Sequence, residues 1–275
     1  MSGQRPPLFD PRAEQAQRRR AERIGGERFL EAAALEGLTD RLSTVTRRFG
    51  QGLWIGDRVP AAIQSFAGSW SRRYFDGNGM LDGGESQFDL AISLYTLQSV
   101  NDLPGALIQI RRALRPDGLF LAALFGGDTL KELRQCFALA ESEVRGGVSP
   151  RVAPFADVRD LGGLLQRAGF ALAVADSERL LARYQNLLDL ARDLRTHGQT
   201  NVLAARSRHF LGRRVLAALE ACYAAHHASD GKFNATFETI VLTGWAPHES
   251  QQKPLRPGSA TTRLSDALGT VERKL

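Results

Sequence analysis

A glycine turn is the first feature of the chain that could do chemistry. It lies in the stretch "RFGQGLWIGDRVPAAIQSF", residues 48–66, where a predicted strand at 53–55 leads into Gly56 and Asp57 and then into a predicted helix near 60–67. A glycine here lets the backbone turn tightly and come close to a ligand, as in many nucleotide-binding enzymes. We therefore predict that Gly56 and Asp57 contact a nucleotide-like cofactor.

Acidic side chains follow at a distance suited to binding a ribose. Asp76 ends the apparent strand "SWSRRYFD" and lies 20 residues after Gly56 (76 − 56), close to the ~20 expected for a ribose-binding acid. Alternatively, Asp76 belongs only to a turn in "DGNG", residues 76–79, where Asp is favoured for local hydrogen bonds. The sequence leaves both interpretations open. Asp82 is an additional candidate, for the adenine side of the same cofactor.

A third polar segment, "SLYTLQSVND" at residues 93–102, follows the apolar strand predicted from Phe88 onward. Ligands of open parallel sheets bind where the strands end. Thr96 and Gln98 are therefore candidate cofactor contacts, although they could also simply pack. Asn101 and Asp102 directly precede a helical segment, and we expect them to cap it.

Other kinds of site have little support. The five histidines form no HxD or HExxH pattern, and His226 and His227 are adjacent, so that on a helix they point about 100° apart and cannot face one metal ion together. Cys136 and Cys222 lie far apart, and we expect each to be a small apolar filler. The sequence predicts no metal site and identifies no catalytic residue.

Alternating strands and helices are predicted to position the candidate residues. The strand from Phe88, the helix at 102–115 and the strand at 119–125 are joined by short connections, which indicates a parallel crossover and an α/β sheet. The next helix is predicted to begin with a capping box of Thr129 and Glu132. The further predicted elements are a helix stopped by Gly169, a strand at 171–180, helices near 187–197 and 208–227, and a last strand at 236–247.

Composition sets the class and the organisation of the chain. Of the 275 residues, 43% are hydrophobic and 24% charged, which is typical of a globular protein. We predict a basic flexible arm (1–25), a main domain (26–247) with helical insertions at 128–145 and 186–228, and a mobile tail (248–275). The sequence shows no secretory signal and no apolar run near the ~18 residues that span a bilayer, so a cytoplasmic protein is expected.

The net charge of +6 suggests an acidic partner. Basic residues are not interleaved with aromatic ones on a recognisable nucleic-acid module, so no nucleic-acid partner is predicted. An acidic protein partner or a peripheral contact with an anionic membrane explains the charge better.

Three long segments carry a resemblance. The segment "FDLAISLYTLQSVNDLPGALIQIRRALRPDGLFLAALFGGDTLKELR" resembles the second half of a class I S-adenosylmethionine-dependent methyltransferase domain. With "SPRVAPFADVRDLGGLLQRAGF" and "GWAPHESQ", the chain is similar to methyltransferase-fold assembly factors of respiratory complex I and their bacterial relatives, and to the malonyl-carrier-protein methyltransferases of biotin synthesis.

The resemblance implies a Rossmann-like class I methyltransferase fold, in which a mostly parallel, seven-stranded sheet ends in a reversed C-terminal hairpin. It also implies S-adenosylmethionine as the cofactor, a protein rather than a small molecule as the substrate, and a peripheral-arm subunit of complex I as a partner.

The cofactor loop departs from the family pattern. Such families have a sequence like LDLGxGxG, whereas "LWIGDRVP" places Trp54 at the acidic position, keeps Gly56 and puts Pro60 where a second glycine would stand. Proline fixes φ and removes an amide donor. Only 32 residues separate Gly56 from Phe88 (88 − 56), although two βα units need ~30 or more each, so the region 57–87 is predicted to be trimmed.

Three functions follow from this combination. The first is an S-adenosylmethionine-dependent methyltransferase, which can work by aligning its substrates without a dedicated nucleophile. The second is a cofactor-impaired assembly or binding factor for complex I, which would use the basic arm, the segment "ARSRHFLGRRV" and the tail as contact surfaces. The third, a protein arginine hydroxylase, rests on analogy alone. A Trp54 or Pro60 side chain that fills the space over Gly56 would favour the second.

Overall fold

The computed structural model describes residues 6–76, 79–252 and 269 of the chain. The strands are β1 (Phe49–Ile55), β2 (Ala67–Arg73), β3 (Phe88–Leu94), β4 (Leu114–Phe125), β5 (Ala171–Tyr184), β6 (Ala228–Ser229) and β7 (Lys232–Trp245). The α-helices are α1 (Pro11–Ile24), α2 (Phe29–Ser43), α3 (Leu103–Ala113), α4 (Lys131–Arg145), α5 (Val158–Arg167), α6 (Leu187–Thr196) and α7 (Arg213–His226), and two short 3-10 helices are η1 (Ala61–Phe66) and η2 (Leu97–Ser99).

One seven-stranded sheet organises the fold. The strand order is β2-β1-β3-β4-β7-β5, and β6 pairs with β7. The strands β2, β1, β3 and β4 are parallel to one another, while β7 runs antiparallel to both β4 and β5. The predicted α/β class, with a largely parallel sheet and a reversed C-terminal strand, is therefore confirmed. Because β1 lies between β2 and β3, the three carboxyl ends that were predicted to hold a cofactor meet at one edge.

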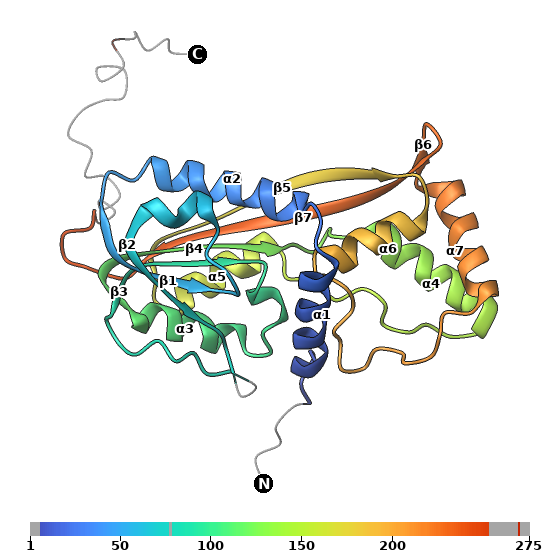
Figure 1. The fold of residues 1–275 in the computed structure, drawn as a ribbon, viewed down its shortest axis with the longest axis horizontal. Coiled ribbons are helices and arrows are strands. Elements are labelled where there is room, and N and C mark those ends of the chain that lie inside the picture. Colours follow the sequence, from blue (N-terminus) through green and yellow to red (C-terminus); the bar gives the residue numbers. More distant parts are fainter. Residues whose placement is uncertain (1–5, 77–78, 253–268, 270–275) are drawn as a thin grey trace, which may run out of the picture.

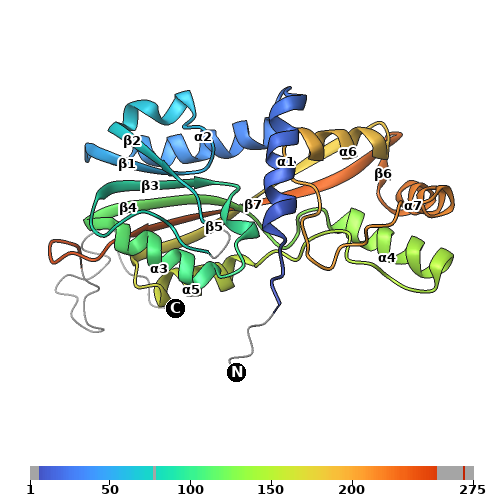
Figure 2. The same ribbon diagram turned by 60° about the horizontal axis from the view of Figure 1, so that its bottom comes forward.

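Helices cover both faces of this sheet (Figure 2). α2 packs on one face, and α3 and α5 pack on the other. Successive side chains of β1 alternate between the two cores, as the pleat of a strand requires. Leu53 and Ile55 belong to the core under α3 and α5, whereas Trp54 belongs to the core under α2.

The strands β5 and β7 extend beyond the rest of the sheet, and α4, α6 and α7 gather around this extension (Figure 1). A disulfide between Cys136 of α4 and Cys222 of α7 joins two of these helices, with the Cα atoms 5.5 Å apart. The prediction that each cysteine is an isolated apolar filler was therefore wrong. The two residues are 86 positions apart, so their spacing in the sequence gave no sign of the pairing.

The described part of the predicted basic arm, residues 6–25, contains a helix. Residues 11–24 form α1, whose Asp10 cap accepts hydrogen bonds from the amides of Arg12 and Ala13. Phe9 is buried and forms a β-bridge with Leu203. The buried Phe9 side chain and the bridge to Leu203 join this segment to the body, although its composition is strongly basic. The predicted mobile tail, apart from residues 248–252 and 269, lies outside the described residues.

Two further predictions concern local structure. The region 57–87 is trimmed as predicted, because η1 leads directly into β2 in place of the predicted α-helix, and the described residues between β2 and β3 contain only turns and a bridge from Phe75 to Leu81. The capping box was wrong. The side chains of Thr129 and Glu132 bind β7 instead of the start of α4, because the Thr129 hydroxyl and the Glu132 carboxylate pair with Glu238 and Thr236.

Candidate functional site

The carboxyl ends of β1, β2 and β3 form the edge where the sequence predicted a cofactor. Gly56 is buried here, and its amide donates a hydrogen bond to the carbonyl of Arg73, the last residue of β2, at 3.2 Å. Asp57 is exposed, and its carbonyl accepts a hydrogen bond from the Arg72 guanidinium. The turn therefore uses the Gly56 amide to join the end of β1 to the end of β2.

The indole of Trp54 occupies the space next to Gly56. A Cβ atom on Gly56 would lie 2.8 Å from Trp54 Nε1 and 3.2 Å from Cε2, and the φ of Gly56 is +156°. Trp54 is 3% exposed, and its Nε1 is buried without a hydrogen-bond partner. The side of Gly56 that lacks a side chain, which a cofactor would approach in a glycine loop, is therefore filled by the protein's own ring.

The predicted acids lie at the surface. Asp76 is exposed in a turn, where its carboxylate accepts a hydrogen bond from the Met80 amide at 2.7 Å and its own amide donates to the Met80 carbonyl. This is the turn that the sequence offered as an alternative. Asp82 is exposed, and its carbonyl accepts a hydrogen bond from Arg73. Two arginines, Arg72 and Arg73, thus stand at the end of β2 instead of an acid.

Thr96 and Gln98 follow β3 and lie at the same edge. The Thr96 hydroxyl donates to the carbonyl of Leu94, and Thr96 is buried. The Gln98 amide nitrogen donates to the Tyr95 carbonyl at 2.8 Å and to Gln199 Oε1 at 3.2 Å, whereas Gln98 Oε1 is buried without a partner. Gln98 therefore offers one unused acceptor.

The positioning of Gln98 depends on Tyr95. This residue has a positive φ of 47°, which turns the chain sharply at the end of β3. Its ring stacks on Phe125 at 4.3 Å, and its hydroxyl lies 2.6 Å from Thr239 Oγ1. Burial raises the pKa of Tyr95 to about 12, so the phenol stays protonated at neutral pH. Stacking and the hydroxyl contact hold the strained turn in place.

Helix α1 packs beside these strand ends (Figure 1). The Arg18 guanidinium lies 4.8 Å from the centre of the Tyr74 ring, just after β2. The Ser99 hydroxyl donates to the Glu14 carboxylate at 2.7 Å. Asn101, which was predicted to cap α3, instead binds the backbone of Phe9, and Asp102 alone caps the helix through the Gly105 amide. The N-terminal segment thus covers part of the predicted site.

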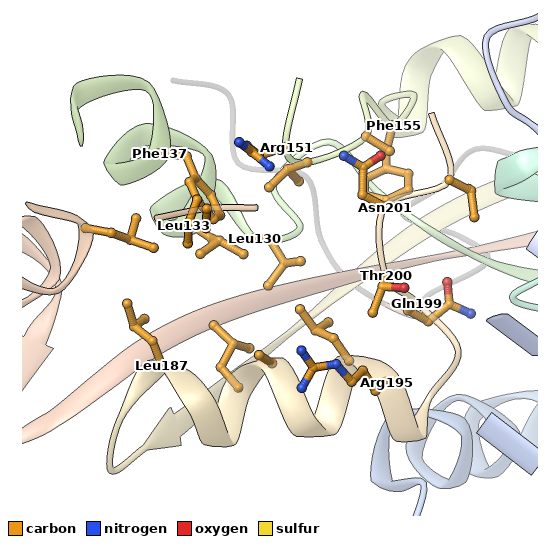
Figure 3. Close-up of a pocket in the computed structure, with 18 of the residues that line it drawn as sticks. Leu130, Leu133, Phe137, Arg151, Phe155, Leu187, Arg195, Gln199, Thr200 and Asn201 are labelled. Atoms are coloured by element: carbon orange, nitrogen blue, oxygen red, sulfur yellow. The ribbon is translucent and has the colours of Figure 1, made fainter. Parts of the chain in front are cut away.

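An apolar cavity opens beside the same edge (Figure 3). Its volume is about 350 Å³, and α4, α6, α7 and the segments around 151–155 and 199–203 form its walls. Figure 3 shows Leu130, Leu133 and Phe137 across the cavity from Leu187 and Arg195 of α6, with Gln199, Thr200 and Asn201 along one side. Gln98 lines the cavity too, so this residue belongs to both the strand edge and the cavity.

A buried ion pair supports one wall of the cavity. Glu141 of α4 is completely buried, and Arg151, which lines the cavity, contacts its carboxylate through Nε at 2.8 Å and Nη2 at 2.5 Å. Burial tends to raise the pKa of Glu141, but Arg151 and the Ser149 amide outweigh it and hold the pKa below its ordinary value. The carboxylate therefore stays ionised and fixes Arg151 against the wall.

The sequence missed this cavity. Arg151, Gln199, Thr200 and Asn201 lie in connecting segments without a recognisable motif. Their neighbours in the cavity come from α4, α6 and α7 and lie up to 68 residues away in the chain (219 − 151), so no local pattern could bring them together. Among the described residues, no group of three or more His, Cys, Asp or Glu side chains could hold a metal ion. No described helix has the length and apolarity needed to cross a membrane.

The strand edge does not match the needs of an adenosyl group in its usual place. Trp54 fills the open side of Gly56, the Gly56 amide is already used, and arginines replace the acid at the end of β2. Of the predicted cofactor residues, the structure brings Gly56, Thr96 and Gln98 to the edge, and leaves Asp57, Asp76 and Asp82 exposed around it.

Known proteins resemble the chain over most of its length. The methyltransferase domain family matches residues 4–174. Arginine-hydroxylase NDUFAF5 of Dictyostelium discoideum is 42% identical over 193 residues, which are 69% of this chain and 44% of that protein. The Homo sapiens protein of the same name is 43% identical over 188 residues, which are 68% of this chain and 54% of that protein. Malonyl-acyl-carrier-protein O-methyltransferase of Laribacter hongkongensis is 36% identical over 170 residues, 62% of this chain and 55% of that protein. The chain spans about half the length of these relatives.

Solved structures share the fold. A putative methyltransferase from Bacillus halodurans superposes with a TM-score of 0.52, covering 77% of this chain and 98% of that one, at 11% identity. The match over residues 4–174 and the shared architecture confirm the resemblance inferred from the sequence. The chain therefore belongs to the methyltransferase domain family and is related to the proteins named arginine-hydroxylase NDUFAF5 and malonyl-acyl-carrier-protein O-methyltransferase.

Proposed function

We propose that the chain is a protein-binding assembly factor for respiratory complex I that uses the methyltransferase fold without transferring a methyl group. The observation that carries this proposal is the Trp54 indole over Gly56, which takes the place of a cofactor. An open cavity beside the same strand ends supplies a binding site of a different kind. The relation to the NDUFAF5 proteins and the resemblance to complex I assembly factors support the choice of partner.

The cavity suits apolar side chains of a protein segment. Its volume of about 350 Å³ is at the lower end of the ~300–1,000 Å³ of typical ligand pockets. Leucine and phenylalanine side chains make up most of its walls, and Gln98, with its unused acceptor, offers one polar contact. The net charge of +6 favours association with an acidic surface. A peripheral-arm subunit of complex I is the partner that we propose.

Filling the cavity tests this function. Ala191 of α6 lines the cavity, so Ala191→Trp would occupy it, whereas Ala217→Trp places the same side chain on the exposed face of α7. In a strain that lacks the gene, we expect the wild type and Ala217→Trp to restore complex I levels and Ala191→Trp to fail while still folding by circular dichroism. Equal restoration by both variants would show that the cavity does not bind the partner.

S-adenosylmethionine-dependent methylation of a protein is the second candidate function. It is supported by two buried polar atoms without partners near the strand ends, Ser93 Oγ and Gln98 Oε1, which a ligand could satisfy. In that case Thr96 and Gln98 would contact the cofactor. The exposed residues around the strand ends, Asp57, Asp76 and Asp82, would bind it from the solvent side. Isothermal titration with S-adenosylhomocysteine decides between the candidates. We expect no heat, and micromolar binding that Gln98→Leu abolishes would establish the second candidate.

Two further expectations belong to this proposal. Hydroxylation of an arginine, the activity in the name of the NDUFAF5 relatives, would leave the partner one oxygen atom heavier, and mass spectrometry of the partner tests this.

A cytoplasmic location stays a prediction. Disulfides seldom persist in a reducing cytoplasm. Thiol labelling of Cys136 and Cys222 in freshly lysed cells therefore tests both the location and the bond.

A further inference from the structure

An aromatic side chain stands almost completely in solvent at the end of the molecule that carries α4 and α7. Phe210 is 97% exposed. Two other strongly exposed apolar residues belong to α4 and to the segment that follows it, Leu139 and Val148, and a third, Leu188 of α6, also lines the cavity. Exposed apolar side chains that gather in one region mark a contact surface more often than scattered ones do.

The backbone around Phe210 is held in place. Arg145 of α4 donates hydrogen bonds from Nη2 to the carbonyls of Phe210 and Leu211, both at 3.0 Å. The side chain of Leu211 lines the cavity, and Gly212, with φ of +70°, turns the chain into α7. Phe210 is therefore presented outward by a fixed loop, residues 207–212, which we call the Phe210 loop.

Cations surround this loop. Arg208, Arg213 and Arg214 are exposed, and none of them forms a hydrogen bond or an ion pair through its side chain in the part of the chain that the structure describes. The exposed carboxylates of α4 and α7 are Glu143 and Glu220. The three unpaired arginines outnumber these two glutamates, so the surface around Phe210 carries a net positive charge.

We propose that the Phe210 loop docks on an anionic lipid bilayer, with the Phe210 ring in the headgroup region and the three arginines against anionic headgroups. A protruding ring among free cations suits a soft, negatively charged interface, because aromatic rings settle at the membrane boundary and basic residues are attracted by anionic lipids. The Phe210 side chain is 97% exposed, so its ring is free to enter the headgroup region of a bilayer. The inference goes beyond the proposed function and does not depend on it.

Vesicle binding tests the proposal with the full-length protein. Co-sedimentation compares vesicles of phosphatidylcholine with vesicles in which one third of the lipid is phosphatidylglycerol. We expect binding to the anionic vesicles alone, and weaker binding as salt is added. Each neutralised arginine should weaken binding about fivefold, so Arg213→Gln with Arg214→Gln should weaken it about 25-fold, and Phe210→Ser about tenfold.

Matched control variants distinguish binding through the Phe210 loop from a general effect of the protein's net charge. Arg19→Gln with Arg20→Gln makes the same change in net charge on exposed positions of α1, and Leu181→Ser removes an apolar side chain that is 55% exposed on β5. Both controls should bind like the wild type. The proposal is overturned if the wild type does not bind to anionic vesicles, or if the control variants lose as much binding as the loop variants. Loop variants that keep vesicle binding but lose binding to polyglutamate would assign the loop to an acidic protein instead.

Discussion

Replacing Gly56 by alanine tests whether Trp54 truly fills the predicted cofactor space. The new Cβ would lie 2.8 Å from Trp54 Nε1, closer than side chains tolerate, and it would also sit on a backbone with φ of +156°. Overpacking a core costs about 1–3 kcal/mol and backbone strain about the same. We therefore expect Gly56→Ala to lower the free energy of unfolding by about 4 kcal/mol.

A double-mutant cycle separates the two contributions. Trp54→Phe removes the indole nitrogen nearest to the new Cβ, so in this background Gly56→Ala should cost only the strain, about 2 kcal/mol. The expected coupling energy is about 2 kcal/mol, well above the ~0.5 kcal/mol within which independent sites add. Urea unfolding followed by far-ultraviolet circular dichroism measures it without relying on tryptophan fluorescence.

Gly231 provides the matched control. Its φ is +70°, and a Cβ there would meet nothing within 4 Å, so Gly231→Ala should cost the strain alone and show no coupling to Trp54→Phe. A coupling energy below about 0.5 kcal/mol between positions 54 and 56 would refute the reasoning. The space over Gly56 would then be free for a ligand.

Three further predictions concern the rest of the domain. Glu141→Gln leaves Arg151 without its buried anion, so we expect a loss of about 3–5 kcal/mol in urea unfolding, whereas Glu143→Gln, on the exposed face of the same helix, should lose less than about 0.5 kcal/mol. Reduction of the Cys136–Cys222 disulfide, which closes a long loop, should lower the free energy of unfolding by about 2–4 kcal/mol, and Cys136→Ser with Cys222→Ser should make the protein insensitive to the reductant. Burial lowers the pKa of His197 to about 4, and both ring nitrogens lack hydrogen-bond partners. Between pH values of about 6.5, the ordinary pKa of histidine, and about 4, the unfolded chain therefore binds more protons than the folded one. Stability should therefore fall as the pH drops through this window, by about 3 kcal/mol, and His197→Leu should flatten the dependence. An unchanged slope in thermal melts would contradict this assignment.

The fold was predictable because its signals are local and agree with one another. The strand β3 and the second half of β4 are short apolar runs, and the helix α3 between them carries an apolar stripe. The segment 57–87 was too short for two full units, and the missing helix follows from that length. The capping box failed although its pattern was present, because burial against β7 gave Thr129 and Glu132 better partners than the helix start.

The candidate site was only partly predictable. Chain order placed Gly56, Thr96 and Gln98 correctly at the ends of neighbouring parallel strands. It could not show which way the Trp54 ring turns, and this direction decides what Gly56 can do. The cavity wall and the disulfide join segments that are far apart in the chain, so they follow from packing alone.

The exchange of the family's acidic residue for Trp54 has two consequences that act in the same direction. It removes a carboxylate from the strand end, and it supplies a ring that fills the open side of Gly56. Gly56 then has to stay a glycine for the sake of packing, even where no ligand is bound. A retained glycine in such a loop is therefore weak support for cofactor binding until the side chain two residues before it has been located. In this chain Trp54 and Gly56 are buried, and the cavity that reaches Gln98 offers accessible space beside the same strand ends.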